Sequence, residues 1–267
     1  MPERVSLPDP AYVGYRIGAL AARGVPERRV EQASEVLGRL TSRLLAPRRR
    51  IVERTIERVH GPGLSEAEVA RRTDAVFASY ARYWIESFRL PTTPPESIDA
   101  GVRTEGYEYL DAALAGGRGA IMALPPLGGW EWVAFWLARI KGPDVTAVVE
   151  PVDPPELADW FVDLRRGFGI NVVPLGPSAG AACVQALKDN HVLALLCDRD
   201  IAGGGVEVEF FGERTTLPGG PATLALRTGA PLIPAAIYYD GPDHLGVARP
   251  PMEVDPPGRL RDDVARV

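Results

Sequence analysis

Glu131 lies in a segment whose pattern could build a reacting centre. An apolar run, Gly119–Leu124, leads into the Pro- and Gly-rich stretch Pro125–Gly129, and a helical pattern follows over Glu131–Ile140. A strand, a glycine-rich turn and a helix place side chains at the carboxyl end of a parallel strand, where open α/β sheets bind their ligands. Taken singly, Glu131 would be a carboxylate stabilised by the dipole at the start of a helix.

A second carboxylate, Asp198, directly follows another apolar run, Val192–Leu196, in the order Cys197-Asp198-Arg199-Asp200. A carboxylate at the end of a buried strand requires a partner, because its desolvation costs free energy. An ion pair with Arg199 or another nearby Arg would satisfy this requirement without any catalytic role.

Glu150 and Arg165 are the next candidates. Glu150 ends the apolar run Val145–Val149, and Arg165 lies in a stretch of helical pattern ending at Gly169. A guanidinium at such a position can bind a phosphate of a substrate with charge-assisted hydrogen bonds. The alternative is an ordinary Arg on a helix surface.

The segment Val206–Glu213 alternates apolar and acidic residues and contains Phe-Phe-Gly, which predicts a strand and a turn. The residues Pro218–Pro221 that follow open the next helix. Without further information this segment is a structural hairpin.

The fold that positions these candidates is predicted by the alternation of strand and helix patterns after residue 100. Strands are expected at Ala120–Leu124, Val145–Val149, Ile170–Leu175, Val192–Cys197 and Pro231–Tyr238, and helices at Glu131–Ile140, Pro155–Arg166, Ala179–Asn190 and Pro221–Thr228. Such alternation predicts an α/β fold with a mostly parallel central sheet and helices on both faces.

The first part of the chain is predicted to be helical. Helices are expected at Ala11–Arg23, Val30–Leu45 and Arg49–Val59, and Ser65-Glu-Ala-Glu68 forms a capping box that opens a fourth helix. The chain is therefore divided into a helical N-terminal portion, residues 1–95, and an α/β core, residues 96–267.

Composition limits the function classes. A net charge of −5 over 267 residues argues against a nucleic-acid partner. Residues 1–60 nevertheless contain twelve Arg against seven acids, a local charge of +5. This clustering fits either a patch for anionic lipid or a solvated helical surface. Two cysteines fit a reducing compartment, and no apolar run approaches the roughly twenty residues of a membrane span.

The segment Leu124–Trp132 closely resembles the motif of glycerolipid-type acyltransferases, in which a His precedes an Asp or Glu by five positions. Glu131 stands at the acidic position and Pro126 at that of the His. Asp198 matches an acidic residue that pairs with the His in these enzymes, and Arg165 and the Phe-Phe-Gly block match further signatures. The whole pattern resembles the bacterial lipid A lauroyl- and myristoyl-acyltransferase superfamily, and within it the actinobacterial phosphatidylinositol mannoside acyltransferases.

The resemblance implies transfer of a fatty acyl group from acyl-CoA to a mannose hydroxyl of a phosphatidylinositol mannoside, without a cofactor or a metal. It places the protein on the cytoplasmic face of the plasma membrane, held peripherally by its N-terminal helices. Glu131 and Asp198 are then the catalytic candidates, and Glu150, Arg165, Trp130 and Trp132 the substrate-binding ones. An apolar slot for the acyl chain is expected near Trp130, Trp132, Phe135 and Trp136, unless these rings only fill the core.

Pro126 departs from the family motif, because proline has no side-chain group that accepts a proton. Three alternatives to an active enzyme of the usual kind stay open. The chain could be an inactive homologue that binds lipid or acyl-CoA, a truncated fragment, or an enzyme in which Glu131 or Asp198 is the base. Arg259–Val267 has the pattern of a helix start without a stop signal, which suggests a truncated C-terminus.

Overall fold

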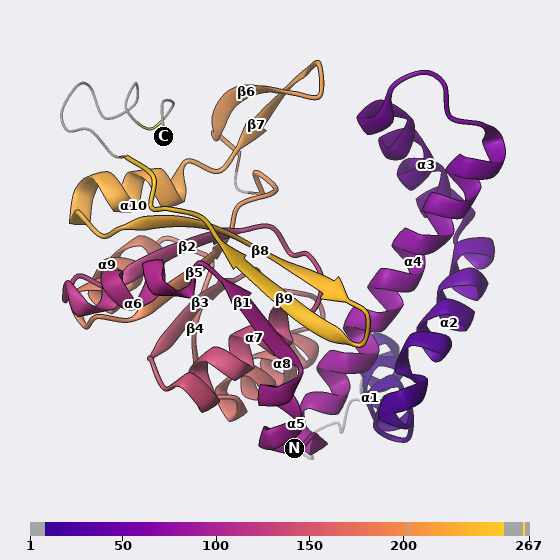
Figure 1. Cartoon of the computed structure of the whole chain (residues 1–267), viewed down its shortest axis with the longest axis horizontal. Coiled ribbons are helices and arrows are strands. Elements are labelled where there is room, and N and C mark those ends of the chain that lie inside the picture. The colour runs from indigo at the N-terminus through magenta and orange to yellow at the C-terminus, as the bar shows by residue number, and fades with distance from the viewer. Residues whose placement is uncertain (1–8, 202, 254–263, 265–267) are drawn as a thin grey trace, which may run out of the picture.

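A seven-stranded sheet forms the centre of the computed structural model, which describes residues 9–201, 203–253 and 264 (Figure 1). The strand order is β1-β9-β8-β2-β5-β3-β4, and every neighbouring pair is parallel except β8 with β9. The strands are β1 (Val102–Glu105), β2 (Ala120–Leu124), β3 (Val145–Val149), β4 (Ile170–Pro174), β5 (Val192–Leu196), β8 (Leu232–Asp240) and β9 (Asp243–Ala248). The expected mixed α/β architecture with a mostly parallel sheet is confirmed.

Helices cover both faces of the sheet, because the side chains of its central strands alternate between two cores. Ala120 and Val192 belong to one core, and Ile121 and Leu193 to the other. The first core packs against α6 (Tyr107–Ala115), α7 (Trp130–Trp136) and α8 (Pro155–Gly167), and the second against α9 (Ala179–Lys188) and α10 (Gly220–Thr228). Strands buried on both faces must be apolar throughout, which is why these five runs were recognisable in the sequence.

Several elements differ from the expectation. The strands β1 and β9 and the helix α6 were not predicted. The edge strand β1 is only four residues long and largely exposed, so it has no apolar run. The expected helix Glu131–Ile140 is shorter: α7 ends at Trp136 and continues as a π-helical turn, Leu137–Lys141. The expected helix start within Arg259–Val267 lies almost wholly outside the described residues.

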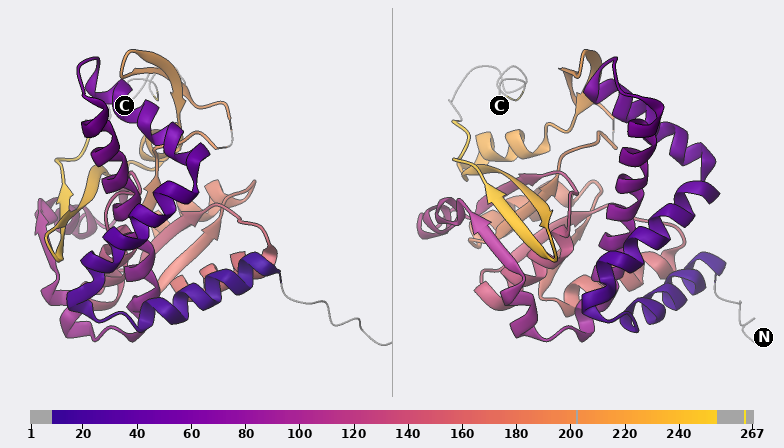
Figure 2. Two further views of the ribbon diagram at one scale, coloured as in Figure 1. Left: turned by 90° about the vertical axis from the view of Figure 1, so that its right-hand side faces the viewer. Right: turned by 45° about the vertical axis from the view of Figure 1, so that its right-hand side comes forward.

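The N-terminal helices form a separate layer beside the sheet. They are α1 (Pro10–Arg23), α2 (Val30–Leu44), α3 (Ala46–His60) and α4 (Glu66–Arg89), with short turns at Glu27–Arg29 and Leu90–Thr92 and the small helix α5 (Pro95–Ala100) after them. The capping box at Ser65 and Glu68 is present as predicted. The helices α2, α3 and α4 extend away from the sheet as an arm (Figures 1 and 2). Among the described residues, no helix combines the length and the hydropathy of a membrane-spanning segment.

The arm joins the sheet through Arg82 on α4. Its guanidinium donates hydrogen bonds of 2.7 Å to the carbonyl oxygens of Gly241 and Pro242, in the turn between β8 and β9. It also lies over the ring of Tyr239, 4.0 Å from the centroid. These contacts anchor α4 to the turn between β8 and β9.

Within the arm, α2 and α4 approach closely at Gly38. A Cβ atom at this position would lie 2.5 Å from the backbone nitrogen and Cα of Ala78, a distance that real Cβ atoms do not reach. Gly38 therefore sets the separation of the two helices.

We expect Gly38→Ala to destabilise the protein by about 1–3 kcal/mol, because the added methyl group must push α2 away from α4. Gly14→Ala is the matched control: Gly14 is also inside a helix, α1, but nothing lies within 4 Å of an added Cβ. The control should be neutral or stabilising by up to about 1 kcal/mol, since alanine favours a helix more than glycine does. Urea unfolding measures both, and equal effects of the two substitutions would contradict the close approach.

Candidate active site

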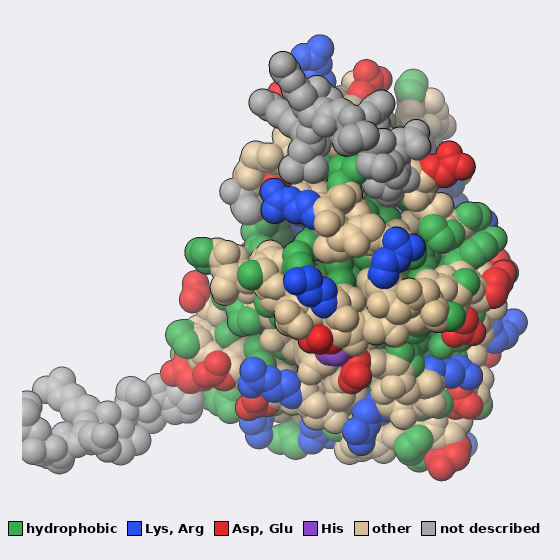
Figure 3. All heavy atoms as spheres, turned by 90° about the vertical axis from the view of Figure 1, so that its left-hand side faces the viewer, with side chains coloured by type: hydrophobic (Ala, Val, Ile, Leu, Met, Phe, Trp, Pro, Cys, Tyr) green, Lys and Arg blue, Asp and Glu red, His purple; other side chains and the backbone are tan. Residues whose placement is uncertain are grey.

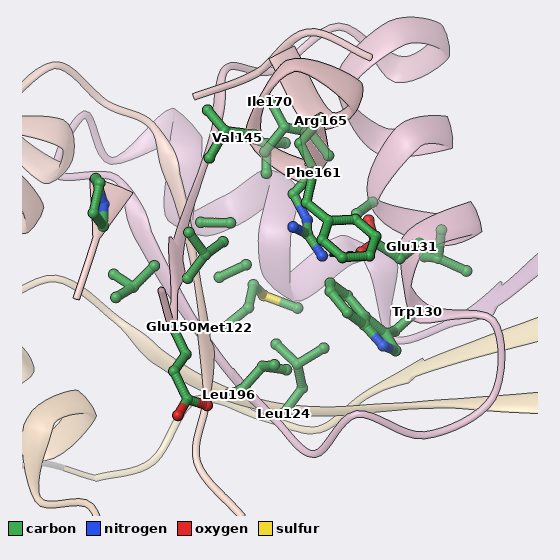
Figure 4. Close-up of a pocket in the computed structure, with 18 of the residues that line it drawn as sticks. Met122, Leu124, Trp130, Glu131, Val145, Glu150, Phe161, Arg165, Ile170 and Leu196 are labelled. Atoms are coloured by element: carbon green, nitrogen blue, oxygen red, sulfur yellow. Dashed lines mark hydrogen bonds and ion pairs between the residues drawn. The ribbon is translucent and has the colours of Figure 1, made fainter. Parts of the chain in front are cut away.

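An apolar cavity of about 480 Å³ lies between the sheet and the helices α7 and α8. We call it the inner cavity. Side chains of β2, β3, β4 and β5 form its wall, from Val145 and Ile170 at one end to Leu124 and Leu196 at the other (Figure 4). Its volume lies in the range of small-ligand sites, and its lining suits a hydrocarbon chain.

One ion pair interrupts this apolar lining. Arg165 on α8 donates a hydrogen bond from Nη2 to Oε1 of Glu131 on α7, and both side chains line the inner cavity (Figure 4). Glu131 is only 5% exposed. Burial alone would lower the pKa of Arg165, but the Glu131 carboxylate raises it above its usual value, so the guanidinium stays charged. Oε2 of Glu131 and Nε of Arg165 are buried without a hydrogen-bond partner among the described residues.

Aromatic rings surround the pair. The Arg165 guanidinium lies 5.7 Å from the ring of Trp130 and 5.8 Å from that of Phe161. Tyr83 on α4 stacks on Trp130 at 6.0 Å and donates a hydrogen bond of 3.4 Å to Oε1 of Glu131. Burial and the neighbouring Glu131 carboxylate raise the pKa of Tyr83, so its hydroxyl keeps its proton. The next residue of α4, Trp84, lines the inner cavity, so the arm contributes to its wall.

A second cavity, of about 420 Å³, lies at the carboxyl ends of the central strands and between α9 and α10. We call it the edge cavity. Pro126, Glu150 and Asp198 line it together, as the sequence suggested for strand ends. Arg199 lies 3.7 Å from Glu150 and 3.8 Å from Asp198, so the ion pair expected as the alternative for Asp198 is present. Glu150 and Leu196 line both cavities, which makes the two spaces neighbours.

The sequence candidates thus fall into two groups. Glu131, Arg165 and Trp130 meet at the inner cavity, whereas Pro126 and Asp198 meet at the edge cavity, with Glu150 bordering both.

Trp132 lies instead in the core, where its Nε1 is 3.5 Å from the carbonyl oxygen of Ile98. Phe135 packs on Phe168, and Nε1 of Trp136 donates a hydrogen bond to Asp99. These rings therefore fill the core, which was the alternative to an acyl-chain slot.

Sequence analysis missed Tyr83, Phe161 and Arg199 as site residues. Phe161 carried a usable signal, because it precedes Arg165 by four residues and so lies on the same helix face. Arg199 adjoins Asp198 and was considered only as its ion-pair partner. Tyr83 had no local signal, since only the packing of the arm brings it to Glu131.

The turn before α7 is supported from behind by a buried polar cluster. A Cβ atom at Gly129 would lie within 2.8–3.0 Å of three ring atoms of His244 on β9, so glycine is required there. His244 is 2% exposed, and its Nε2 lies 3.4 Å from Oε2 of Glu86 on α4. Arg82 pairs with the other Glu86 oxygen at 2.7 Å. The cluster therefore links the arm to the backbone of the motif.

Comparison with known proteins identifies this arrangement. A family model described as bacterial lipid A biosynthesis acyltransferase matches residues 7–265. A curated phosphatidylinositol mannoside acyltransferase of Mycobacterium tuberculosis is 36% identical over 233 residues, which cover 85% of this chain and 72% of the relative. One of Mycolicibacterium smegmatis is 35% identical over 234 residues, 86% of this chain and 75% of the relative.

The fold and these similarities define an enzyme of the acyltransferase class. The chain belongs to the bacterial lipid A biosynthesis acyltransferase family, which confirms the resemblance seen in the sequence.

The ion pair yields a stability prediction. Arg165→Met should destabilise the protein by about 3–5 kcal/mol, because it leaves the buried Glu131 carboxylate without its counter-charge. The double variant Arg165→Met/Glu131→Gln should recover a large part of this loss, since no buried charge remains. Urea unfolding of both variants provides the measurement. A double variant as unstable as Arg165→Met alone would mean that packing, and not charge, accounts for the effect.

The buried cluster yields a prediction about pH. Burial raises the pKa of Glu86 from 4.5 to about 7, although Arg82 and Arg89 act against the shift. Burial, with a further contribution from Arg82, lowers the pKa of His244 from 6.5 to about 4. The ring of Tyr239, whose own pKa burial raises, also packs on His244.

These two shifts act on stability with opposite signs. Between pH 4.5 and 7 the folded state retains the Glu86 proton that the unfolded chain has lost, so this contribution to stability falls as the pH rises. Between pH 4 and 6.5 the unfolded chain binds a proton on His244 that the folded state does not, so this contribution rises with pH. In the native protein the two slopes largely cancel.

We expect single variants to expose each slope. Glu86→Gln should make stability rise with pH between about 4 and 6.5, and His244→Asn should make it fall between about 4.5 and 7, each by up to about 1.4 kcal/mol per pH unit. Urea unfolding across this pH range, with the native protein in the same buffers, measures the slopes. Profiles of both variants that run parallel to the native one would contradict the two shifts.

Proposed function

We propose that this acyltransferase moves a fatty acyl group from acyl-CoA to a mannose hydroxyl of a phosphatidylinositol mannoside. The acceptor is taken from the names of the mycobacterial relatives, which are phosphatidylinositol mannoside acyltransferases. The donor is inferred from the inner cavity, which is the single observation that carries the proposal.

The inner cavity suits the acyl chain of a thioester donor. It is enclosed by aliphatic and aromatic side chains, and the edge cavity adjoins it at Glu150 and Leu196. A chain that fills the inner cavity would present its thioester carbon at the carboxyl ends of the strands. The acceptor hydroxyl would then enter by the edge cavity, beside Asp198.

The reaction requires a base that accepts the proton of the attacking hydroxyl. When the hydroxyl attacks the thioester carbon, the C–O bond forms, the C–S bond breaks, and the hydroxyl proton must leave. Pro126 has no side-chain acceptor for that proton. Glu131 is engaged by Arg165 and Tyr83 in the inner cavity, so Asp198 is the carboxylate best placed to accept it. We therefore expect slow turnover.

A second candidate function follows from the same residue. Pro126 favours an inactive homologue that binds acyl-CoA or lipid in these cavities without transferring the acyl group. Acyl-CoA binding without turnover would identify it.

We further propose that the protein binds the cytoplasmic face of a membrane through its N-terminal helices. Exposed aliphatic side chains gather on α1 and α2, among them Ile17, Leu20, Val36, Leu40 and Leu44. Residues 1–60 also carry the local charge of +5, which would attract anionic lipid. On the face of the molecule opposite the arm, by contrast, basic and acidic side chains are interspersed (Figure 3).

The test of the proposed function is Pro126→His. An imidazole at position 126 would enter the edge cavity together with Asp198, which could orient it. A positioned base contributes about 10²–10⁴-fold, so transfer from labelled acyl-CoA to phosphatidylinositol mannoside should rise by at least about tenfold over the native chain. Adding Asp198→Asn should remove most of this gain.

Pro126→Gln is the matched control, because it removes the proline ring without supplying a base. Its rate should stay at that of the native chain. If Gln raises the rate as much as His, then release of the proline ring, and not proton transfer, is responsible. If neither variant transfers acyl groups while acyl-CoA still binds, the protein is an inactive homologue that binds acyl-CoA.

A further inference from the structure

The Phe-Phe-Gly block forms the tip of a hairpin that rises from the rim of the edge cavity. The hairpin consists of β6 (Val206–Phe210) and β7 (Glu213–Leu217), which pair antiparallel. Ile201 before it and Pro218 after it both line the edge cavity. At about 3.4 Å per residue, five-residue strands keep the tip within about 17 Å of this rim.

The tip exposes two aromatic rings. Phe210 is 57% exposed and Phe211 is 52% exposed, and their rings contact each other edge to face with centroids 4.7 Å apart. Large apolar side chains gain free energy when they leave water, and these two adjacent rings gain little of it within the chain. Their position is therefore not explained by the core of this molecule.

The backbone of the tip does not explain Phe211 either. Phe210 pairs with Glu213, so Phe211 and Gly212 form a two-residue loop, with φ of +49° and +75°. Positive φ at both positions is typical of a type I′ turn, for which Asn-Gly is the preferred sequence. A phenylalanine in the left-handed region is unfavourable, because its Cβ crowds the backbone. Both the turn and the solvent would favour asparagine at position 211.

The hairpin also has a fixed place relative to the arm. Glu213 at the tip forms an ion pair of 2.5 Å with Arg58 on α3. The hairpin and the loop between α3 and α4 project to the same side of the molecule (Figures 1 and 2). The tip is thus directed to the side to which the distal end of the arm projects.

We infer that the Phe210–Phe211 tip inserts into the surface of a lipid bilayer and holds the mouth of the edge cavity close to it. Two rings are too small for a stable protein interface, which buries about 800 Å² on each partner. Aromatic rings, in contrast, are favourable singly at the boundary between lipid headgroups and acyl chains.

The charges near the tip separate this contact from that of the N-terminal helices. Glu207 and Glu209 on β6 are exposed, and Arg214 is the neighbour of Glu213. Because its acidic residues outnumber its basic ones, the hairpin has no electrostatic attraction for anionic lipid. The two phenylalanine rings alone must therefore bind the membrane. The contribution of the tip should therefore persist at high salt, where the attraction of the Arg-rich helices is screened.

The inference builds on the proposed lipid acceptor, because a short tip beside the edge cavity would bring a membrane-held headgroup within reach of Asp198. Its test does not depend on turnover.

The experiment is sedimentation of the native chain with vesicles of phosphatidylcholine and phosphatidylglycerol, compared with Phe210→Ser/Phe211→Asn. Asparagine suits the left-handed position, so this variant should fold with at least native stability. We expect its partition into vesicles to fall by about tenfold or more, at low and at high salt. Tyr238→Ser is the control, because Tyr238 on β8 is an aromatic residue of similar exposure, and its partition should stay native.

Three outcomes would overturn the inference. Equal partition of the native chain and the tip variant would exclude insertion. A native dimer that the variant converts to a monomer, seen by sedimentation velocity without vesicles, would show that a second copy covers the rings. Normal vesicle binding with lost transfer to a soluble short-chain acceptor would assign the rings to substrate. If the variant binds vesicles less well but the protein shows no acyl transfer at all, membrane insertion of the tip is supported and only the proposed function is refuted.

Discussion

The buried ion pair between Glu131 and Arg165 joins the parts of this molecule that meet at the inner cavity. Glu131 lies in the first turn of α7, Arg165 lies in the last turn of α8, and Tyr83 reaches the same carboxylate from α4. A buried charge pair is stable only with close contacts and additional hydrogen bonds, so its presence constrains the relative position of all three helices.

The same constraint determines which residue can do chemistry. A carboxylate that neutralises a buried guanidinium and accepts a hydrogen bond from a tyrosine hydroxyl is poorly suited to accept a substrate proton. In the proposed reaction Glu131 therefore contributes to the shape and charge of the inner cavity, and the edge cavity holds the proposed proton acceptor. There Asp198 is shared between solvent and Arg199, beside a proline that has no acceptor group.

Gly129 shows how remote residues support this centre. Its backbone lies against His244 from β9, and His244 contacts Glu86 from the arm. The helical portion thus reaches the motif at two points, by Tyr83 in front and by the Glu86–His244 contact behind. A change in the position of the arm would be transmitted to the turn that begins α7, because the His244 ring packs directly against the backbone of Gly129.

Much of the fold was predictable because its central strands are buried on both faces. Such strands must be apolar throughout, and the runs at Ala120–Leu124 and Val145–Val149 were found with their observed bounds. The strand β1 was not, because it has only four residues and its side chains are largely exposed. The Phe-Phe-Gly turn was found from local residues, but its exposed rings and positive φ angles were visible only in three dimensions.

The sequence by itself determined the strand-and-helix alternation, the family and the acidic residues at strand ends, because these depend on local pattern and on the order of motifs. The tertiary structure alone decided how these residues are grouped. It paired Glu131 with Arg165 rather than with the position of Pro126, and it buried Trp132 in the core while leaving Trp130 at the cavity. Such pairings depend on distances between segments far apart in the chain, and residue types and spacing within one segment do not specify them.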